Sequence, residues 1–399
     1  MEQIIFHIDV NSAYLSWSAL SLLEEGSDTD LREVPSIIGG DMEKRHGVVL
    51  AKSVPAKKYG IVTGEPIVNA LRKCPTLILQ SPDHQLYHRK SQALMDYLSH
   101  ICPDIEQVSV DECFMDFTPI RHLYPSPEAA AAAIKDGVKN TFGFTVNIGI
   151  STQKVLAKMA SDFQKPDRVH TLYPREIRQK MWPLPVSSLY MCGKSSVQVL
   201  HNLEIRTIGD LARTDKQILS AHLKSHGITL WEYANGIDAS KVNPLPQEAK
   251  GIGNSTTLSK DVTDREEAFK TLLELAESVG SRLRKAGQLA GSLTVEIKYN
   301  TFRSVSHQTT LPSGSNATGL LYETACRLFN ELWDGTPIRL LGIRSAKLID
   351  CSAPTQLSLF DIGTAPVNEK LAALDKTLDQ IRQKYGDNAV IRGSLLTKK

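Results

Sequence analysis

Two short acidic segments, far apart in the chain, carry residues whose types and spacing could do chemistry. The first, Phe6–Tyr14, places Asp9 at the end of an apolar run, and the second, Val108–Asp116, contains the adjacent pair Asp111 and Glu112. Carboxylate oxygens are the donors that Mg²⁺ prefers. Three such side chains can hold a pair of Mg²⁺ ions about 3.5–4 Å apart, which is the usual arrangement for in-line phosphoryl or nucleotidyl transfer.

Each acidic motif also has a plainer explanation. An aspartate after a strand often only caps the following helix, and an acidic pair often lies in a solvated turn. Because adjacent strand residues point to opposite faces, Asp111 and Glu112 can share one site only where a hairpin turns or bulges. The apolar residues around the pair place that turn at the edge of a core. Asp116 is expected to be structural.

Lysines at two places could bind the phosphates of a nucleotide. Lys57 lies in the lysine-rich segment Ala51–Gly60, and Lys165 ends a predicted helix just before Pro166. Facing a carboxylate-held metal site, such lysines suit a triphosphate. The alternatives are a solvated helix face for Lys57 and an interaction with the helix dipole for Lys165.

Tyr14 lies on the first turn of a predicted helix, which Asn11 or Ser12 can cap and which ends at Gly26. An aromatic ring close to a metal-bound nucleotide could pack against the sugar and leave no room for a 2′-hydroxyl group. The alternative is an ordinary core aromatic.

The composition limits the broad class of protein. The chain has 399 residues, of which 41% are hydrophobic and 23% charged, as expected for a globular protein of several domains. The formal net charge is only +2, so nucleic-acid binding would rely on local basic patches. The scattered cysteines argue against a zinc site and a disulfide framework. With no long apolar run and no basic leader, we expect a cytoplasmic protein without a membrane span.

The first part of the chain interleaves predicted strands and helices. The main elements are a strand at Gln3–Asp9, a helix to Gly26, a helix at His84–Cys102, a hairpin at Glu106–Phe117, a helix at Glu128–Phe142, a strand at Thr145–Ser151 and a helix at Gln153–Phe163. Ser151 is expected to cap the last of these helices.

The next regions have different patterns. Residues from about 170 to 236 show no strand pattern, and Ser188–Leu211 resembles a helix–turn–helix element with Gly193 in its turn. Backbone amides at such a turn can bind DNA phosphates. The prolines of Asp238–Lys250 indicate a linker. Residues 251–350 follow the order βαββαβ, which predicts a small α+β domain.

The segment after Cys351 is expected to be an unpacked tail with one late helix, Val367–Lys384. Its segment Gln356–Phe360 contains Leu357, Leu359 and Phe360. Exposed apolar side chains on such a tail suggest a peptide that docks into the groove of a partner. The alternative is that the tail packs back onto its own body.

Taken together, the chain resembles the Y-family translesion DNA polymerases, and within them the bacterial DNA polymerase IV group. The resemblance extends over nearly the whole chain in the same order. It is carried most specifically by Ser109–Glu112, Gly149–Ser151 with Lys165-Pro166, Thr207–Ala212, Arg339–Ile343 and the docking peptide.

The resemblance implies an α+β, multidomain, right-hand polymerase fold. The implied domains are a palm (1–25 and 75–168), small fingers (26–74), a helical thumb (169–236), a linker (237–250), a βαββαβ little finger (251–350) and a C-terminal tail (351–399) that carries the clamp-docking peptide. The implied activity is template-directed addition of dNTPs to a primer, with low fidelity, no proofreading and tolerance of damaged template bases.

The resemblance also implies roles for individual residues. The metal ligands would be Asp9, Asp111, Glu112 and the carbonyl of Val10, holding two Mg²⁺ ions for which Mn²⁺ can substitute. Tyr14 would be the steric gate against ribonucleotides, and Lys57 and Lys165 would bind the triphosphate. The DNA-phosphate candidates are Lys298, Arg303 and Arg344, and the clamp-docking residues are Gln356, Leu357, Leu359 and Phe360. The implied partners of this monomer are primer-template DNA, dNTPs and a sliding clamp.

Several positions depart from the family pattern. Ala13 stands where an aromatic residue is usual, Val54 and Lys57 stand where a tyrosine and an arginine usually grip the triphosphate, and Gln153 replaces an asparagine. Lysine keeps the charge of arginine but loses its bidentate fork. The turn at Met191-Cys192-Gly193 lacks the usual first glycine.

Three of these departures, Val54, Ala13 and Gln153, are the only support for a competing class, a non-catalytic DNA- and clamp-binding scaffold derived from such a polymerase. The intact carboxylate trio argues against it, because three acidic groups held together are costly to keep without a metal. Another two-metal palm enzyme, such as a nucleotidyl cyclase, would share the carboxylates but would not explain the thumb, the little finger or the docking peptide.

Overall fold

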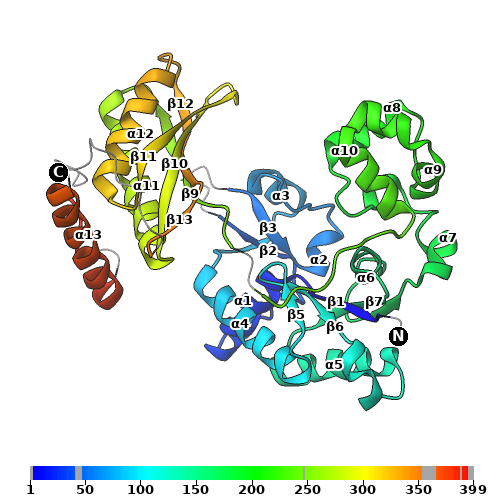
Figure 1. The fold of residues 1–399 in the computed structure, drawn as a ribbon. Coiled ribbons are helices and arrows are strands. Elements are labelled where there is room, and N and C mark those ends of the chain that lie inside the picture. The colour runs from blue at the N-terminus through cyan, green and yellow to red at the C-terminus, as the bar shows by residue number, and fades with distance from the viewer. Residues whose placement is uncertain (1–2, 41–46, 246–247, 353–364, 387–388, 394–399) are drawn as a thin grey trace. The chain divides into compact units, whose positions relative to one another are not determined.

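The computed structural model describes residues 3–40, 47–245, 248–352, 365–386 and 389–393. The chain forms two compact units, which divide at the gap between residues 245 and 248 (Figure 1). The docking peptide predicted at Gln356–Phe360 lies outside the described residues. No helix in the described ranges is long and apolar enough to cross a membrane.

A five-stranded sheet forms the centre of the first unit. Its order is β5 (Ile105–Gln107), β6 (Glu112–Asp116), β1 (Ile5–Val10), β7 (Val146–Ser151) and β8 (Val169–Thr171). The central strand β1 is antiparallel to β6 and β7, whereas β7 and β8 are parallel. The strands β5 and β6 form the predicted hairpin, with Asp111 in its turn and Glu112 at the start of β6.

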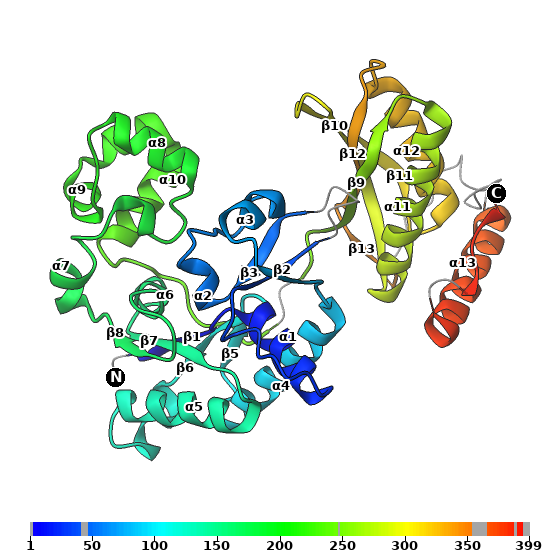
Figure 2. The same cartoon turned by 180° about the vertical axis from the view of Figure 1, so that it is seen from behind.

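The two faces of this sheet have different coverings because side chains alternate along each strand. Phe6, Ile8 and Val10 of β1 pack into a large apolar core together with residues of three helices. These helices are α1 (Ala13–Glu24), α4 (His84–Ile101) and α5 (Pro127–Phe142). His7 and Asp9 point to the opposite face, which α6 (Lys154–Ser161) covers (Figures 1 and 2). The side chains of His7 and Asp9 therefore lie between the sheet and α6.

The approach of α6 to the sheet depends on Gly149 of β7. A Cβ atom at this position would lie 2.0 Å from the carbonyl oxygen of Ala157 and 2.5 Å from the backbone nitrogen of Ser161. Only glycine therefore allows the helix this close to the strand. The predicted cap of α6 is wrong: Ser151 ends β7, its hydroxyl donates to the carbonyl of Leu172 at 2.6 Å, and Gln153 holds the cap position without a side-chain bond.

A smaller three-stranded sheet lies between α1 and α4 in the sequence. Its order is β3 (Val49–Lys52), β2 (Ser36–Gly39) and β4 (Ile78–Gln80), and it carries α2 (Val54–Lys57) and α3 (Ile67–Lys73). Ile37 belongs to a separate small core of this region, whereas Ile38 on the other face packs with Leu15 and Ala19 of α1. The small sheet is thereby fixed to the helix that follows the Asp9 strand.

The described chain that follows β8 in the first unit, up to Ala234, is mainly helical. After the 3-10 helix η1 (Thr118–Leu123) of the earlier region, the later elements are η2 (Pro174–Glu176), α7 (Ile177–Lys180), η3 (Val186–Ser188), α8 (Lys194–Asn202), α9 (Ile208–Arg213) and α10 (Lys216–Ala234). Gly193 caps the start of α8, whereas the prediction placed it in the turn of a helix–turn–helix element; residues 203–207 join α8 to α9. Thr207 and Asp210 form a capping box at the start of α9.

The second unit has the predicted βαββαβ order. Its elements are β9 (Gly251–Val262), α11 (Arg265–Lys285), β10 (Gln288–Tyr299), β11 (Ser304–Ser315), α12 (Thr318–Leu332), β12 (Ile338–Ala346) and the short β13 (Ile349–Asp350). The sheet order is β11-β10-β12-β9, and both helices cover one face, where Val295 and Ile297 join their core (Figure 2). On the other face, Glu296 of β10 and Arg344 of β12 are exposed.

The expectation of an unpacked tail is wrong for the described part of it. The late helix α13 (Ala365–Tyr385) is fastened to α11 by ion pairs. Arg284 of α11 pairs with Asp379 at 2.6 Å and with Asp375 at 3.3 Å, and Arg382 pairs with Glu277 at 3.2 Å. Asp375 is only 4% exposed and also accepts a bond from the backbone N–H of Thr318 at 2.7 Å. Complementary charges hold α13 against α11. The pattern of apolar residues predicted the helix but gave no sign of this packing.

Candidate active site

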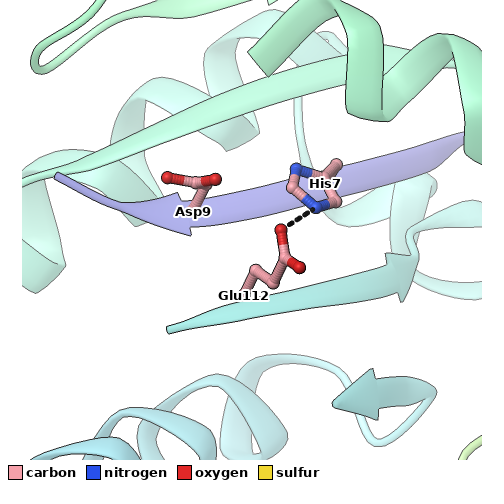
Figure 3. A group of neighbouring side chains, drawn as sticks. All are labelled: His7, Asp9 and Glu112. Atoms are coloured by element: carbon pink, nitrogen blue, oxygen red, sulfur yellow. Dashed lines mark ion pairs between the residues drawn. The ribbon is translucent and has the colours of Figure 1, made fainter. Parts of the chain in front are cut away.

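Asp9 and Glu112 lie directly opposite each other on the adjacent strands β1 and β6. His7, two residues before Asp9, shares its face of the sheet. One potential ligand atom from each of the three side chains lies within 4.8 Å of the others, as Figure 3 shows. The sequence predicted the two carboxylates, and the strand register explains why they meet.

His7 is fully buried beside Glu112. Its Nδ1 lies 2.8 Å from the hydroxyl of Ser161 on α6. Its Nε2 lies 3.3 Å from a carboxylate oxygen of Glu112, but the two atoms lack hydrogen-bond geometry, so this buried nitrogen has no hydrogen-bond partner among the residues that the structure describes. The imidazole therefore directs an unpaired polar atom toward the carboxylates.

Lys158 of α6 bridges the two strands. Its ammonium group donates to Glu112 at 2.8 Å and to Asp9 at 3.3 Å. Lys165, beyond the end of α6, donates to the other oxygen of Asp9 at 2.8 Å. Two lysines thus neutralise the charges of Asp9 and Glu112. The prediction had Lys165 at the end of the helix, but it reaches the site from the turn that follows α6.

The protonation of these groups follows from their contacts. The pKa of Glu112 is lowered to about 2 by the contact with His7 and, against the opposing effect of burial, by Lys158. Burial alone would lower the pKa of Lys158, but Asp9 and Glu112 together raise it. Burial also lowers the pKa of His7. Because the His7 contact lacks hydrogen-bond geometry, we regard Lys158 as the main partner of the Glu112 carboxylate.

The depressed pKa of Glu112 makes a testable contribution to stability. A carboxyl group whose pKa falls from 4.5 to about 2 on folding stabilises the protein above pH 4.5, and this contribution is lost as the pH falls toward 2. The shift corresponds to at most roughly 3 kcal/mol. In EDTA, we expect Glu112→Gln to lower the free energy of unfolding most at neutral pH, and the deficit to shrink between pH 4.5 and 2.

Urea unfolding of both proteins at a series of pH values measures this difference. Glu204→Gln serves as the control, because the Glu204 side chain is 85% exposed and its contact with Arg206 is long, at 3.7 Å. A Glu112→Gln deficit that does not change with pH would contradict the prediction.

Asp111 lies in the turn before Glu112, outside the group of three among the described residues. Its carboxylate accepts a hydrogen bond from the hydroxyl of Ser109 at 2.6 Å. Its carbonyl accepts from the backbone N–H of Val10 at 2.9 Å, so the turn is fastened to the strand end next to Asp9. The backbone positions of Asp9, Val10, Asp111 and Glu112 therefore adjoin, while the Asp111 side chain points to Ser109.

Tyr14 lies on the first turn of α1 and is partly exposed. Its ring stacks on Tyr87 of α4 with a centroid distance of 4.2 Å and an interplanar angle of 9°. His84 lies edge-on to the same ring at 6.1 Å. The ring is thus held in place by one face and one edge, which agrees with either a gate or a core aromatic.

The lysine-rich segment forms β3 and α2 of the small sheet. Lys57 lies exposed on the last turn of α2, and Val54 at its start is 49% exposed. In the described part of the chain, Lys57 makes no hydrogen bond or ion pair with Asp9 or Glu112. Burial and the neighbouring charge of Lys57 lower the pKa of Lys52. Positive charge therefore gathers at this end of β3.

In the second unit, the predicted phosphate contacts lie on or beside the face of the sheet opposite the two helices. Arg344 of β12 pairs in register with Thr294 and lines a groove together with Glu296. Lys298 has its ammonium 5.3 Å from the ring centre of Phe302, a turn residue that is 63% exposed. Arg303, beyond that turn, pairs with Asp334 at 2.7 Å and stacks on Tyr299.

Sequence reasoning missed His7 and Lys158. Alternation puts His7, two residues from Asp9, on the same face of the strand, but its residue type alone does not mark it as a site residue. Lys158 stands one helical turn after Lys154 on the face of α6 that meets the sheet, and only that packing brings it to the site. Lys154 itself pairs with Glu106 at 2.7 Å. The two carboxylates supply hard oxygen donors and His7 an unpaired nitrogen, so this donor set fits a divalent cation.

Comparison with known proteins agrees with this geometry. Residues 8–162 match the impB/mucB/samB family, and residues 249–359 match the C-terminal domain of that family. A protein of Clostridium acetobutylicum named DNA polymerase IV is 50% identical, with 100% of this chain and 99% of that protein covered. DNA polymerase IV 1 of Bacillus subtilis strain 168 is 34% identical, with 99% and 94% covered.

A solved structure has the same fold. A Y-family DNA polymerase chimera superposes with a TM-score of 0.76 at 20% identity, with 87% of this chain and 99% of the chimera covered. The fold is accordingly the α+β right-hand architecture of those polymerases. With matches to both family domains and full-length relatives, the chain belongs to the impB/mucB/samB family of Y-family DNA polymerases, in the group of proteins named DNA polymerase IV.

Proposed function

We propose that the protein is a translesion DNA polymerase, which adds dNTPs to the 3′-hydroxyl of a primer on a template. The observation that carries the proposal is the pair Asp9 and Glu112, placed opposite each other on β1 and β6 in a chain that matches its relatives over its full length. We infer low fidelity and no proofreading, and the ability to copy damaged template.

Each site residue has a proposed task. Asp9, Asp111, Glu112 and the carbonyl of Val10 would hold two Mg²⁺ ions, for which Mn²⁺ can substitute. Such ions would supply activation of the primer hydroxyl and neutralisation of the leaving pyrophosphate.

The lysines and Tyr14 have the other tasks. Lys165 would exchange its contact with Asp9 for the triphosphate, and Lys57 would add positive charge from the small sheet. Lys158 remains as the counter-ion that keeps Asp9 and Glu112 facing the same space, because it contacts both at once. Tyr14 would exclude ribonucleotides.

We assign the regions of the chain to the parts of the right hand. The palm would be 1–25 and 75–168, the fingers 26–74, the thumb 169–236, the linker 237–250 and the little finger 251–350. The distinct apolar cores of the large sheet, the small sheet and the second unit support this division, whereas the core of the helical region also includes Val155, Leu156, Met159 and Ala160 of α6.

The partners follow from the same assignment. Primer-template DNA would meet the little finger near Lys298, Arg303 and Arg344, with salt-sensitive binding that does not depend on sequence.

The six free cysteines suit a reducing cytoplasm. We place the protein in the cytoplasm as a monomer.

Primer extension tests the polymerase proposal. A labelled primer on an undamaged template is incubated with Mg²⁺ and single dNTPs, and correct and incorrect additions are compared. We expect distributive, error-prone addition. A protein that binds primer-template but adds no nucleotide would instead favour the non-catalytic scaffold.

We also propose that Gln356, Leu357, Leu359 and Phe360 dock on the sliding clamp. Replacing Leu359 and Phe360 by alanine is expected to weaken clamp binding at least about a hundredfold, since two buried apolar anchors are lost. Surface plasmon resonance on immobilised clamp measures the affinity, and extension of a short primer without clamp is the control that should not change. Retained clamp affinity would place the docking site elsewhere.

A further inference from the structure

The turn that carries Lys165 lies beyond the helix and needs its own support. α6 ends at Ser161, and residues 162–168 lead from it to β8. The Lys165 side chain is 32% exposed, and its ammonium group lies 2.8 Å from Asp9. A lysine at the edge of a site keeps such a position only if its backbone is held, because its long side chain is flexible.

The Asn147 side chain, on β7, makes hydrogen bonds to the backbone of this turn. It lies directly opposite Asp9 in the strand register and is fully buried. Its amide nitrogen donates to the carbonyl oxygens of Ser161 at 3.0 Å and Gln164 at 2.7 Å. Its amide oxygen accepts from the backbone N–H of Arg168 at 3.2 Å. One side chain thus bonds the turn before and after Lys165, with both of its donor hydrogens used.

Other contacts hold the turn as well. Lys165 also pairs with Asp162 at 2.9 Å, and the carbonyl of Arg168 accepts from the backbone N–H of Ile148 at 2.9 Å. Asp167 pairs with Lys135 at 2.9 Å and with Lys139 at 3.0 Å, both on α5. Nε2 of His170 lies 3.1 Å from the carbonyl of Gln164. The Asn147 side chain differs from the side chains of Asp162, Asp167 and His170 because it stands on the strand that pairs with the Asp9 strand. Its bonds therefore fix the position of the turn relative to Asp9 and Glu112.

We propose that Asn147 is a positioning residue, which sets Lys165 opposite Asp9 and thereby determines how tightly the enzyme binds the triphosphate of a dNTP. The proposal rests on the proposed role of Lys165. The planar amide suits this task because it offers two donors and one acceptor in fixed directions. Serine is too short to reach three backbone groups, and aspartate would turn an oxygen toward the carbonyls of Ser161 and Gln164.

A double-mutant cycle tests the coupling. The four proteins are wild type, Asn147→Ser, Lys165→Ala and the double variant, and the KM for a correct dNTP is measured for each. We expect Asn147→Ser to raise this KM about tenfold to a hundredfold in the wild-type background, since a displaced lysine loses the triphosphate. In the Lys165→Ala background the same change should have no further effect. Equal effects in both backgrounds would overturn the proposal.

A second readout does not depend on activity. The Arg168 amide bonds to Asn147, so hydrogen exchange of a peptide covering 164–168 should become faster in Asn147→Ser. Ser151→Ala is the matched control: it removes a buried hydrogen bond of the same strand, to Leu172, and should leave both this exchange and the KM unchanged. If Asn147→Ser does not fold, Asn147→Asp, which keeps the shape of the side chain, replaces it in the cycle.

The outcomes separate the possible failures. No extension by the wild type would refute the proposed polymerase. Wild-type KM in Lys165→Ala alone would refute the role of Lys165 and the positioning proposal with it, while leaving polymerase activity standing. A raised KM in Lys165→Ala with wild-type KM in both Asn147 variants would overturn the positioning proposal alone.

Discussion

Asp111→Ala is expected to lower the rate of nucleotide incorporation about a thousandfold, which is roughly 4 kcal/mol of transition-state stabilisation. The reason is the position of Asp111 at the start of the Glu112 strand, with its carbonyl bonded to the backbone of Val10. Single-turnover primer extension with saturating dNTP and Mg²⁺ measures the rate.

The matched control is Asp116→Asn at the far end of the same strand. Asp116 accepts hydrogen bonds from the Gln3 side chain at 2.8 Å and the Thr118 backbone at 3.0 Å, so it fastens loop segments. Its substitution should lower stability and leave the rate within a few-fold of wild type. A rate within a few-fold of wild type for Asp111→Ala would remove Asp111 from the metal ligands and leave Asp9 and Glu112 with another partner, for which His7 is the nearest candidate.

Two of the departures from the family pattern have a structural explanation, which weakens the scaffold alternative. Gln153 accepts a hydrogen bond from the backbone N–H of Asp238 at 3.2 Å, and Asp238 in turn accepts from Val155 at 3.0 Å. The longer side chain therefore helps to fasten the chain that leaves the helical region. Ala13 is 5% exposed within the main core. Val54 alone of the three is solvent-exposed, so it has no packing role that would explain it.

The sequence predicted the large sheet and its acidic pair because both follow from periodicity. The strand at Gln3–Asp9 and the hairpin at Glu106–Phe117 were predicted, with Asp9, Asp111 and Glu112 at one site. The strand register brings Asp9 and Glu112 together, while the Asp111 side chain points to Ser109. The same reasoning could have included His7, but a buried histidine after an apolar residue carries no signal of its own. Element order in the second unit was also predictable, since its strands and helices are long and strongly patterned.

The remaining features depend on contacts between distant segments. Lys158, Asn147 and the Lys165 turn meet only after α6 has packed on the sheet, and Gly149 permits that approach. The packing of α13 depends on buried ion pairs, such as Arg284 with Asp375, whose residues are typical of a solvated helix when considered singly. Charge patterns in a sequence do not distinguish a solvated face from one that meets a complementary partner.

Tyr14→Ala is expected to lower the preference for deoxyribonucleotides over ribonucleotides about a hundredfold, because the exclusion depends on the volume of one ring. The stacked contact with Tyr87 at 4.2 Å holds that ring, so a 2′-hydroxyl group cannot displace it. The preference is the ratio of kcat/KM for dATP and ATP opposite the same template base.

Tyr14→Phe is the matched variant, since it keeps the ring and its stacking on Tyr87 and loses only the hydroxyl. It should keep the wild-type preference, because steric exclusion does not need the hydroxyl. Equal loss in both variants would mean that a hydrogen bond, not the ring, selects the sugar. An unchanged preference in Tyr14→Ala would mean that the Tyr14 ring only packs between α1 and α4 and does not select the sugar.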